Sequence, residues 1–147
     1  MKVKCSFADE VQKALHRAGI SDGHLVSQTP ESPAFGDTGA VFNVGPFLLR
    51  FVRDRGQIFV DLSSHAKPAQ FHQFDDVIVA MGWRTIAEVL ARSEPEPVDA
   101  VLQQVKAHWH DLKRAFAGAH EQMTRARVQR TAHERSQAFV ASLQKRP

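Results

Sequence analysis

The chain has 147 residues, of which 43% are hydrophobic and 24% are charged, a composition that argues against wholesale disorder and favours one globular domain. Its single cysteine, Cys5, excludes an internal disulfide framework and a cysteine-rich zinc site. The net charge of +3 is unevenly distributed, because residues 1–120 hold 13 Lys and Arg against 14 Asp and Glu, whereas residues 121–147 hold 6 against 2. The basic character therefore belongs to the C-terminal part.

The sequence shows neither an apolar run of signal-peptide length at its start nor a stretch approaching the roughly 20 apolar residues that span a bilayer. We therefore expect a cytoplasmic protein without membrane contact. It also lacks GxSxG, HExxH, GxGxxG and phosphate-loop motifs. These observations favour a protein that is not an enzyme and needs no cofactor; a small enzyme whose catalytic residues meet only in space is the less favoured alternative.

The N-terminal part predicts a helix from about Phe7 to Ala18. Ser6 and Asp9 are spaced as a capping box, with Asp in place of the usual Glu, and Gly19 is placed to end the helix. Residues 21–38 are rich in Ser, Gly, Pro and Asp, with one apolar pair near residue 25 that could form an edge strand.

Short β-rich runs follow between residues 40 and 62. AVFNV, FLLRFVR and QIFVDL are separated by Gly-Pro and by Asp-Arg-Gly, which predicts an antiparallel meander of three strands. We interpret residues 54–56 as a three-residue hairpin loop with Gly56 in a bulge, which pairs Arg53 with Gln57 and Phe51 with Phe59.

That register places Arg50 opposite Val60 on an apolar face of the hairpin. An arginine there must either extend its side chain to solvent or meet an acidic partner. Both faces of the hairpin are apolar, so we expect helices or a partner to cover each side.

Two short helices are predicted next. Asp75 can cap the first, which Gly82 ends, and residues 85–91 form the second, followed by the linker SEPEP. The overall prediction is an α+β fold.

The last segment predicts one long helix. Its apolar residues alternate at steps of four and three, as a heptad seam requires. These residues are Val98, Leu102, Val105, Trp109, Leu112, Phe116, Ala119, Met123 and Ala126. A continuous helix to Leu143 would be about 65–70 Å long, so we expect a break near Gly118 or pairing outside the domain. We divide the chain into an α+β domain, 1–117, and a basic helical extension, 118–147.

The eight histidines do not predict a metal site. The closest pair, His108 and His110, is two residues apart, so on a helix the two rings point in different directions. We interpret the histidines as surface residues.

Five residues are candidates for binding a partner. Asp75, Asp76, Glu94 and Glu96 could face a basic protein, although a role at helix N-termini explains them equally well. Trp83 could be an aromatic anchor or a core residue.

Four arginines of the C-terminal part, Arg125, Arg127, Arg130 and Arg135, could contact nucleic acid or an acidic protein surface. They fall at several angles around a helix and no aromatic residue lies among them, so a solvated helix end is the simpler interpretation, and nucleic acid is not the expected partner. The seam residues after Phe116 could form a homodimer.

The stretch FGDTGAVFNVGPFLLRFVRDRGQIFVDL, followed by FDDVIVAMGW and IAEVL, resembles small bacterial proteins of the immunity type. The resemblance covers Phe35 to about Leu90 and is carried by a hairpin. It implies an antitoxin that binds a cognate toxin domain and occludes its active site. The alternative is a nucleic-acid-associated regulator that uses the basic C-terminal helix.

Overall fold

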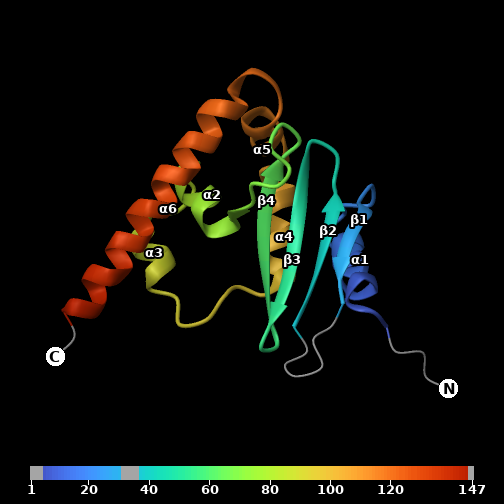
Figure 1. Cartoon of the computed structure of the whole chain (residues 1–147), viewed down its shortest axis with the longest axis horizontal. Helices are drawn as coiled ribbons and strands as arrows, with labels where there is room; N and C mark the ends of the chain where they lie inside the picture. Colours follow the sequence, from blue (N-terminus) through green and yellow to red (C-terminus); the bar gives the residue numbers. More distant parts are fainter. Residues whose placement is uncertain (1–4, 31–36, 146–147) are drawn as a thin grey trace.

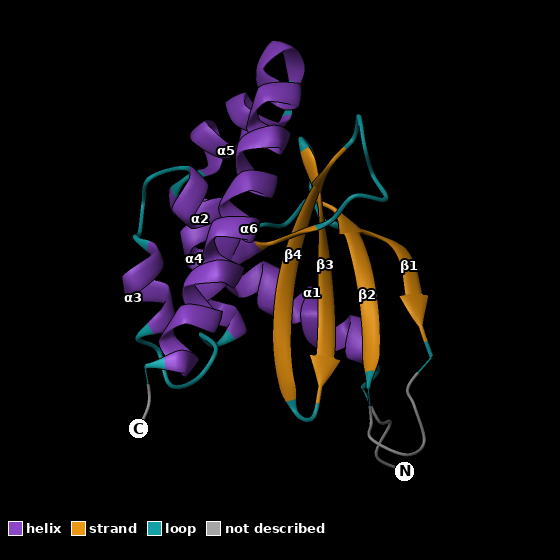
Figure 2. Cartoon of the chain, turned by 60° about the vertical axis from the view of Figure 1, so that its left-hand side comes forward, coloured by secondary structure: helices purple, strands orange, loops and turns teal. Residues whose placement is uncertain are grey.

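The computed structural model describes residues 5–30 and 37–145, so Phe35, where the resembling stretch begins, lies outside the described residues. The chain forms a five-stranded antiparallel sheet with helices on one face and beside one edge (Figures 1 and 2). The predicted α+β fold is confirmed.

The strands follow each other in the sheet in chain order. Their bounds are His24–Thr29 for β1, Thr38–Asn43 for β2, Phe47–Asp54 for β3, Gln57–Ser64 for β4 and His72–Gln73 for β5. The predicted meander and the edge strand near residue 25 are therefore confirmed. The two-residue β5 was not predicted, because so short a strand leaves no alternating pattern to recognise.

The predicted hairpin register is wrong by one residue. Arg55 and Gly56 both have positive φ, 51° and 81°, and Asp54 pairs with Gln57, which describes a two-residue loop of the type I′ kind. An arginine seldom adopts positive φ, so the sequence favoured the three-residue loop. In the observed register Phe51 pairs with Val60.

The shift moves each side chain of β4 to the opposite face of the sheet. Phe59 leaves the face of Phe51 and pairs with Val52. Arg50 pairs with Asp61 instead of Val60. The expectation that Arg50 must reach solvent or meet an acid is confirmed, since its guanidinium binds the Asp61 carboxylate.

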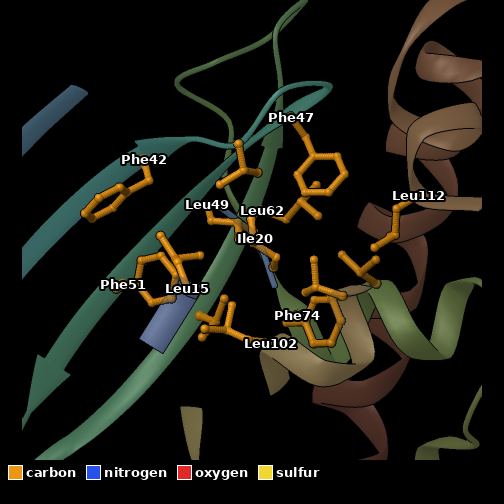
Figure 3. Packing of buried hydrophobic residues seen from close by; sticks show 14 of the residues in the cluster. Leu15, Ile20, Phe42, Phe47, Leu49, Phe51, Leu62, Phe74, Leu102 and Leu112 are labelled. Carbon is orange, nitrogen blue, oxygen red and sulfur yellow. The ribbon is translucent and has the colours of Figure 1, made fainter. Parts of the chain in front are cut away.

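The core lies between one face of the sheet and two helices, α1 (Phe7–Arg17) and α4 (Val98–Ala107). Figure 3 shows Leu49 and Phe51 of β3 among side chains from these helices, Leu15 and Leu102; all four are fully buried. The predicted capping box of α1 is present, because Ser6 and Asp9 each accept a hydrogen bond from the other's backbone N–H. The core is thus apolar. The capping box fixes the N-terminus of α1 at Ser6.

Two short helices lie beyond β5. The first is α2 (Phe74–Ala80) and the second is α3 (Ile86–Leu90). The capping role predicted for Asp75 is wrong, because Gln73 is the N-cap residue and Asp75 lies in the first turn. Gly82 ends α2 as predicted, with φ +79° and hydrogen bonds that form a Schellman motif.

The C-terminal helical segment is divided into shorter helices. Its parts are α4, α5 (Trp109–Phe116), a 3₁₀ turn η1 (Gly118–His120) and the long α6 (Glu121–Gln144). Ala117 is extended and Gly118 has φ +83°, so the predicted break near Gly118 is confirmed. After the break α6 runs back alongside α2 and α3 (Figures 1 and 2).

The heptad seam does not continue across this break. Met123 is 66% exposed, and Ala119 and Ala126 are also exposed. The face of α6 that is buried instead carries Glu121, Thr124, Val128 and Thr131. Because the 3₁₀ turn resets the helical phase, a different and more polar set of residues is buried on α6.

Candidate functional site

A groove of about 700 Å³ runs along the outer edge of β4 and is lined by side chains from both faces of the sheet and by Val101 of α4. The groove lies between β4, the start of α2, the α3–α4 linker and the end of α6. Its lining includes the rings of Phe59, Phe71 and Phe139 together with Arg50 and Arg92. A second hollow of about 560 Å³ adjoins it at Arg50 and extends toward β1 and β2. The two hollows thus meet at Arg50, on the sheet side of the groove.

Arg50 and Asp61 form the ion pair at the sheet side of the groove. The Arg50 guanidinium donates to Asp61 Oδ2 at 2.7 and 3.0 Å and lies over the Phe71 ring, 4.3 Å from its centroid. Burial raises the pKa of Asp61, while the hydrogen bonds from Arg50 oppose that shift. Arg50 thus offsets only part of the desolvation cost of placing the Asp61 carboxylate on the sheet.

Arg135 of α6 fastens the helix end to α2. Its Nε donates to Asp76 Oδ1 at 2.5 Å, and a second nitrogen donates to the Gln73 side chain at 2.5 Å. Asp76 is 4% exposed, and its hydrogen bond raises the pKa of Arg135. A buried carboxylate with this partner serves to hold α6 in place.

A third arginine, Arg92, connects α2 to the linker before α4. It binds Asp75 at 2.5 Å and Glu96 at 3.3 Å. Glu96 also accepts hydrogen bonds from Arg84 and, at 2.6 Å, from Gln104. The linker that forms one wall of the groove is therefore held by a connected network of charges.

The five residues predicted to bind a partner do not form one group. Asp75, Glu94 and Glu96 line the groove, whereas Asp76 lies beneath it behind Arg135. Trp83 is not among the groove residues; its indole stacks on the His108 ring at 3.7 Å between centroids. Glu94 makes no ion pair with any residue in the described ranges.

The four arginines of α6 divide into two pairs. Arg125 binds Glu121 at 3.0 Å and Arg135 binds Asp76, so both guanidiniums face the protein. Arg127 and Arg130 are exposed and, within the described part of the chain, form no ion pair. The structure therefore does not bring the four together on one basic surface.

Sequence reasoning missed Phe59, Phe71, Arg92 and Phe139 as groove residues. Phe59 was assigned to the wrong face by the register error. Arg92 and Phe71 gave no signal, because their partners are distant in the sequence. Phe139 lies beyond Ala126, the last residue of the predicted heptad seam, so the seam did not mark it.

A cluster of polar groups lies at the other end of β4. Ser64 Oγ donates to Glu121 Oε1 at 2.7 Å, and Glu121 also accepts from Arg125. The hydrogen bond from Arg125 lowers the pKa of Glu121. His72 lies nearby and is buried, so the interpretation of the histidines as surface residues is wrong for His72, and burial lowers its pKa. The hydrogen bond from Ser64 of β4 to Glu121 attaches the start of α6 to the sheet.

In residues 5–30 and 37–145 there is no cluster of three or more His, Cys, Asp or Glu residues that could hold a metal ion. The described helices include none whose length and apolar character would let it cross a membrane. Comparison with protein-family models, with curated proteins and with solved structures gives no match for this chain. The functional argument therefore rests on the groove.

Proposed function

We propose that this chain is an immunity protein, which binds a cognate bacterial toxin domain in the cytoplasm and occludes its active site. The groove beside β4 is the contact surface in this proposal. The hairpin of β3 and β4, which carries the resemblance to immunity-type proteins, supplies the sheet side of that groove. The function needs surface complementarity and no catalytic residue.

One observation carries the proposal: exposed aromatic rings lie in the groove next to charges that are already paired. Phe59 is 39% exposed and Phe139 is 50% exposed. Rings of this kind are enriched at the centre of protein interfaces, where they supply large contact areas. The ion pairs of Arg50, Arg92 and Arg135 allow these three guanidinium groups to be covered by a partner without being left unpaired.

The charge of the groove indicates the kind of partner. Three arginines and five carboxylates line it, so its lining is acidic although the whole chain carries +3. Opposite charge guides association and excludes wrong partners. A toxin domain with a basic surface, such as a nuclease has, would therefore fit this groove.

The contacts of the arginines in α6 favour protein binding over the nucleic-acid alternative. Phosphate binding depends on guanidinium groups that are free to approach the backbone, and Arg125 and Arg135 are engaged in ion pairs. A salt-series binding assay with an RNA and a DNA duplex separates the two functions: affinity that falls steeply with salt and depends on Arg127 and Arg130 would support the regulator.

The proposal is tested by co-expressing the chain with the product of the adjacent open reading frame. We expect co-purification and protection of the cells. Phe59→Lys should abolish both, because it places a charge among the rings of the groove. Val26→Lys is the matched control, since Val26 is an exposed residue of β1, 59% accessible and outside the groove. Failure of the unaltered chain to bind or protect would overturn the proposal.

A further inference from the structure

The strand β4 has an edge that is only partly paired. On that side β5 pairs with Asp61 and Leu62, and no other strand in the described ranges lies along Gln57–Val60. Figure 1 shows no strand of the described chain beside the first half of β4 on that side, and Ile58, Phe59 and Val60 of this half line the groove. Unpaired edges of this kind are templates for another strand.

The register shows which backbone groups point outward. A two-residue hairpin makes Asp54 and Gln57 a hydrogen-bonded pair, and such pairs alternate along an antiparallel ladder. Ile58 and Val60 therefore direct their N–H and C=O groups away from β3. Leu62, two residues further, pairs with β5 on that same side. Among the described residues no turn, loop or side-chain hydrogen bond reaches the backbone of Ile58 or Val60.

The groove provides space and apolar walls for an added strand. Ile58, Phe59 and Val60 line it from β4, while Val89 of α3 and Val101 of α4 line it from the helices. In an added strand, side chains opposite Ile58 and Val60 would point to the same side of the sheet as these two. Every second residue of the occupant should therefore be apolar.

The other edge of the sheet, β1, is a poorer template. The register of β1 shifts between Leu25 and Ser27, and bulges of this kind disrupt an edge for further pairing. All six residues of β1 are exposed, so an added strand there would have no apolar wall to contact. The described structure thus favours the β4 edge.

We propose that an extended segment of the partner adds to the free edge of β4 as a further strand. The segment hydrogen-bonds the backbone of Ile58 and Val60, presents apolar side chains at alternate positions and carries basic residues that meet the carboxylates of the groove, Glu94 among them. This mode of recognition combines main-chain bonds for affinity with side-chain pockets for specificity. It rests on the proposed function for the identity of the partner, a toxin domain.

The first test compares two substitutions at one position. Ile58→Pro removes the outward N–H, and proline is tolerated at this kind of edge position. Ile58→Val keeps that N–H with a side chain of similar size. We expect the proline variant to bind the product of the adjacent reading frame about tenfold more weakly, as the loss of one interfacial hydrogen bond would cause, and the valine variant to bind within about twofold. Equal affinities would overturn the inference and leave the proposed function standing.

The second test does not depend on that toxin, nor on the proline variant folding. A capped seven-residue peptide of alternating valine and lysine is added to the isotopically labelled full chain, and amide hydrogen exchange is measured by NMR. We expect slower exchange at Ile58 and Val60. A peptide of the same sequence with alternate backbone amides methylated is the control and should have no effect.

Protection at β1 instead, or at neither strand, would overturn the inference. Protection at Ile58 and Val60 in a chain that does not bind the neighbouring gene product would support the edge site and contradict the immunity function. The two proposals can therefore fail separately.

Discussion

The two faces of the sheet differ in the side chains that they carry and in how deeply these are buried. The face toward α1 and α4 buries apolar residues along its length, including Phe42, Leu49 and Phe51. The opposite face carries Arg50 and Asp61, which pair with each other at the border of the groove. The first arrangement stabilises the fold, whereas the second keeps charges and rings available to a partner.

This difference explains how the chain exposes a groove and still folds. The charges around the groove are paired across elements: Arg50 joins two strands, Arg92 joins α2 to the linker and Arg135 joins α6 to α2. Such pairs contribute little net stability but make the position of each wall specific. The covered face therefore supplies most of the stabilising free energy.

The largest expected effect is on the covered face. Phe51→Ala should lower the free energy of unfolding by about 3–5 kcal/mol, because Phe51 is fully buried and its removal leaves a cavity. Phe59→Ala, on the other face, should cost less than about 1 kcal/mol. Urea unfolding followed by circular dichroism measures both. Similar losses for the two variants would contradict the division between the faces.

The next effect concerns the attachment of α6. Arg135→Met leaves the Asp76 carboxylate buried without its partner, which should cost about 2–4 kcal/mol. The double change with Asp76→Leu should recover most of this loss, since no unpaired charge remains. Arg130→Met is the matched control on the exposed side of α6, with an expected change within about 0.5 kcal/mol. A single variant as stable as this control would show that the ion pair does not hold the helix.

A smaller effect should appear on acidification. Burial lowers the pKa of His72 below its ordinary value of 6.5, so the unfolded chain binds a proton that the folded chain does not. The part of the free energy of unfolding that depends on neutral His72 is therefore fully present above pH 6.5. It is lost as the pH falls through 6.5 toward the folded-state pKa. For one such group, the free energy of unfolding changes by at most about 1.4 kcal/mol per pH unit.

His72→Gln should remove this contribution, which unfolding measurements between pH 7 and pH 5 would detect. The groups that act on His72 are Asp76, Arg125, Glu121 and Asp61. The pKa of Glu121 is lowered from 4.5, which keeps that carboxyl below this window, whereas burial raises the pKa of Asp61 from 3.8 toward the window. An unchanged slope in the His72→Gln variant would show that another group titrates there.

The sequence predicted those parts of the fold that depend on neighbouring residues. The capping box at Ser6, the helix ends at Gly19 and Gly82, and the break at Gly118 all follow from local chemistry that a few residues determine. The meander was predictable for the same reason, because alternation and turn residues are local signals.

The groove was not predictable from the sequence, because its walls meet through distant residues. Arg135 is 59 residues from Asp76, and Arg92 is 17 residues from Asp75. The sequence contains each arginine, but no local spacing predicts which carboxylate it will pair with in the fold. Asp75, Glu94 and Glu96 were selected by charge alone, and the structure brings these three to the groove while Trp83 lies elsewhere.

The smallest expected effect lies in the turn where the two faces of the hairpin meet. Arg55 has φ 51°, a conformation that asparagine adopts more readily, so Arg55→Asn should raise the free energy of unfolding by about 0.5 kcal/mol. The substitution keeps the backbone N–H that donates to Asp37. It removes only a 3.9 Å contact with Asp54 between exposed side chains, which contributes little.

Gly56→Ala is the opposing control for the same turn. Gly56 has φ +81°, and a methyl group added to its Cα would meet no atom within 4 Å, so the expected loss of about 1 kcal/mol would arise from the backbone alone. Urea unfolding resolves the sign of both changes. If Arg55→Asn destabilised the chain while Gly56→Ala did not, the two-residue loop would be wrong, and with it the register that places Phe59 and the outward N–H of Ile58 at the groove.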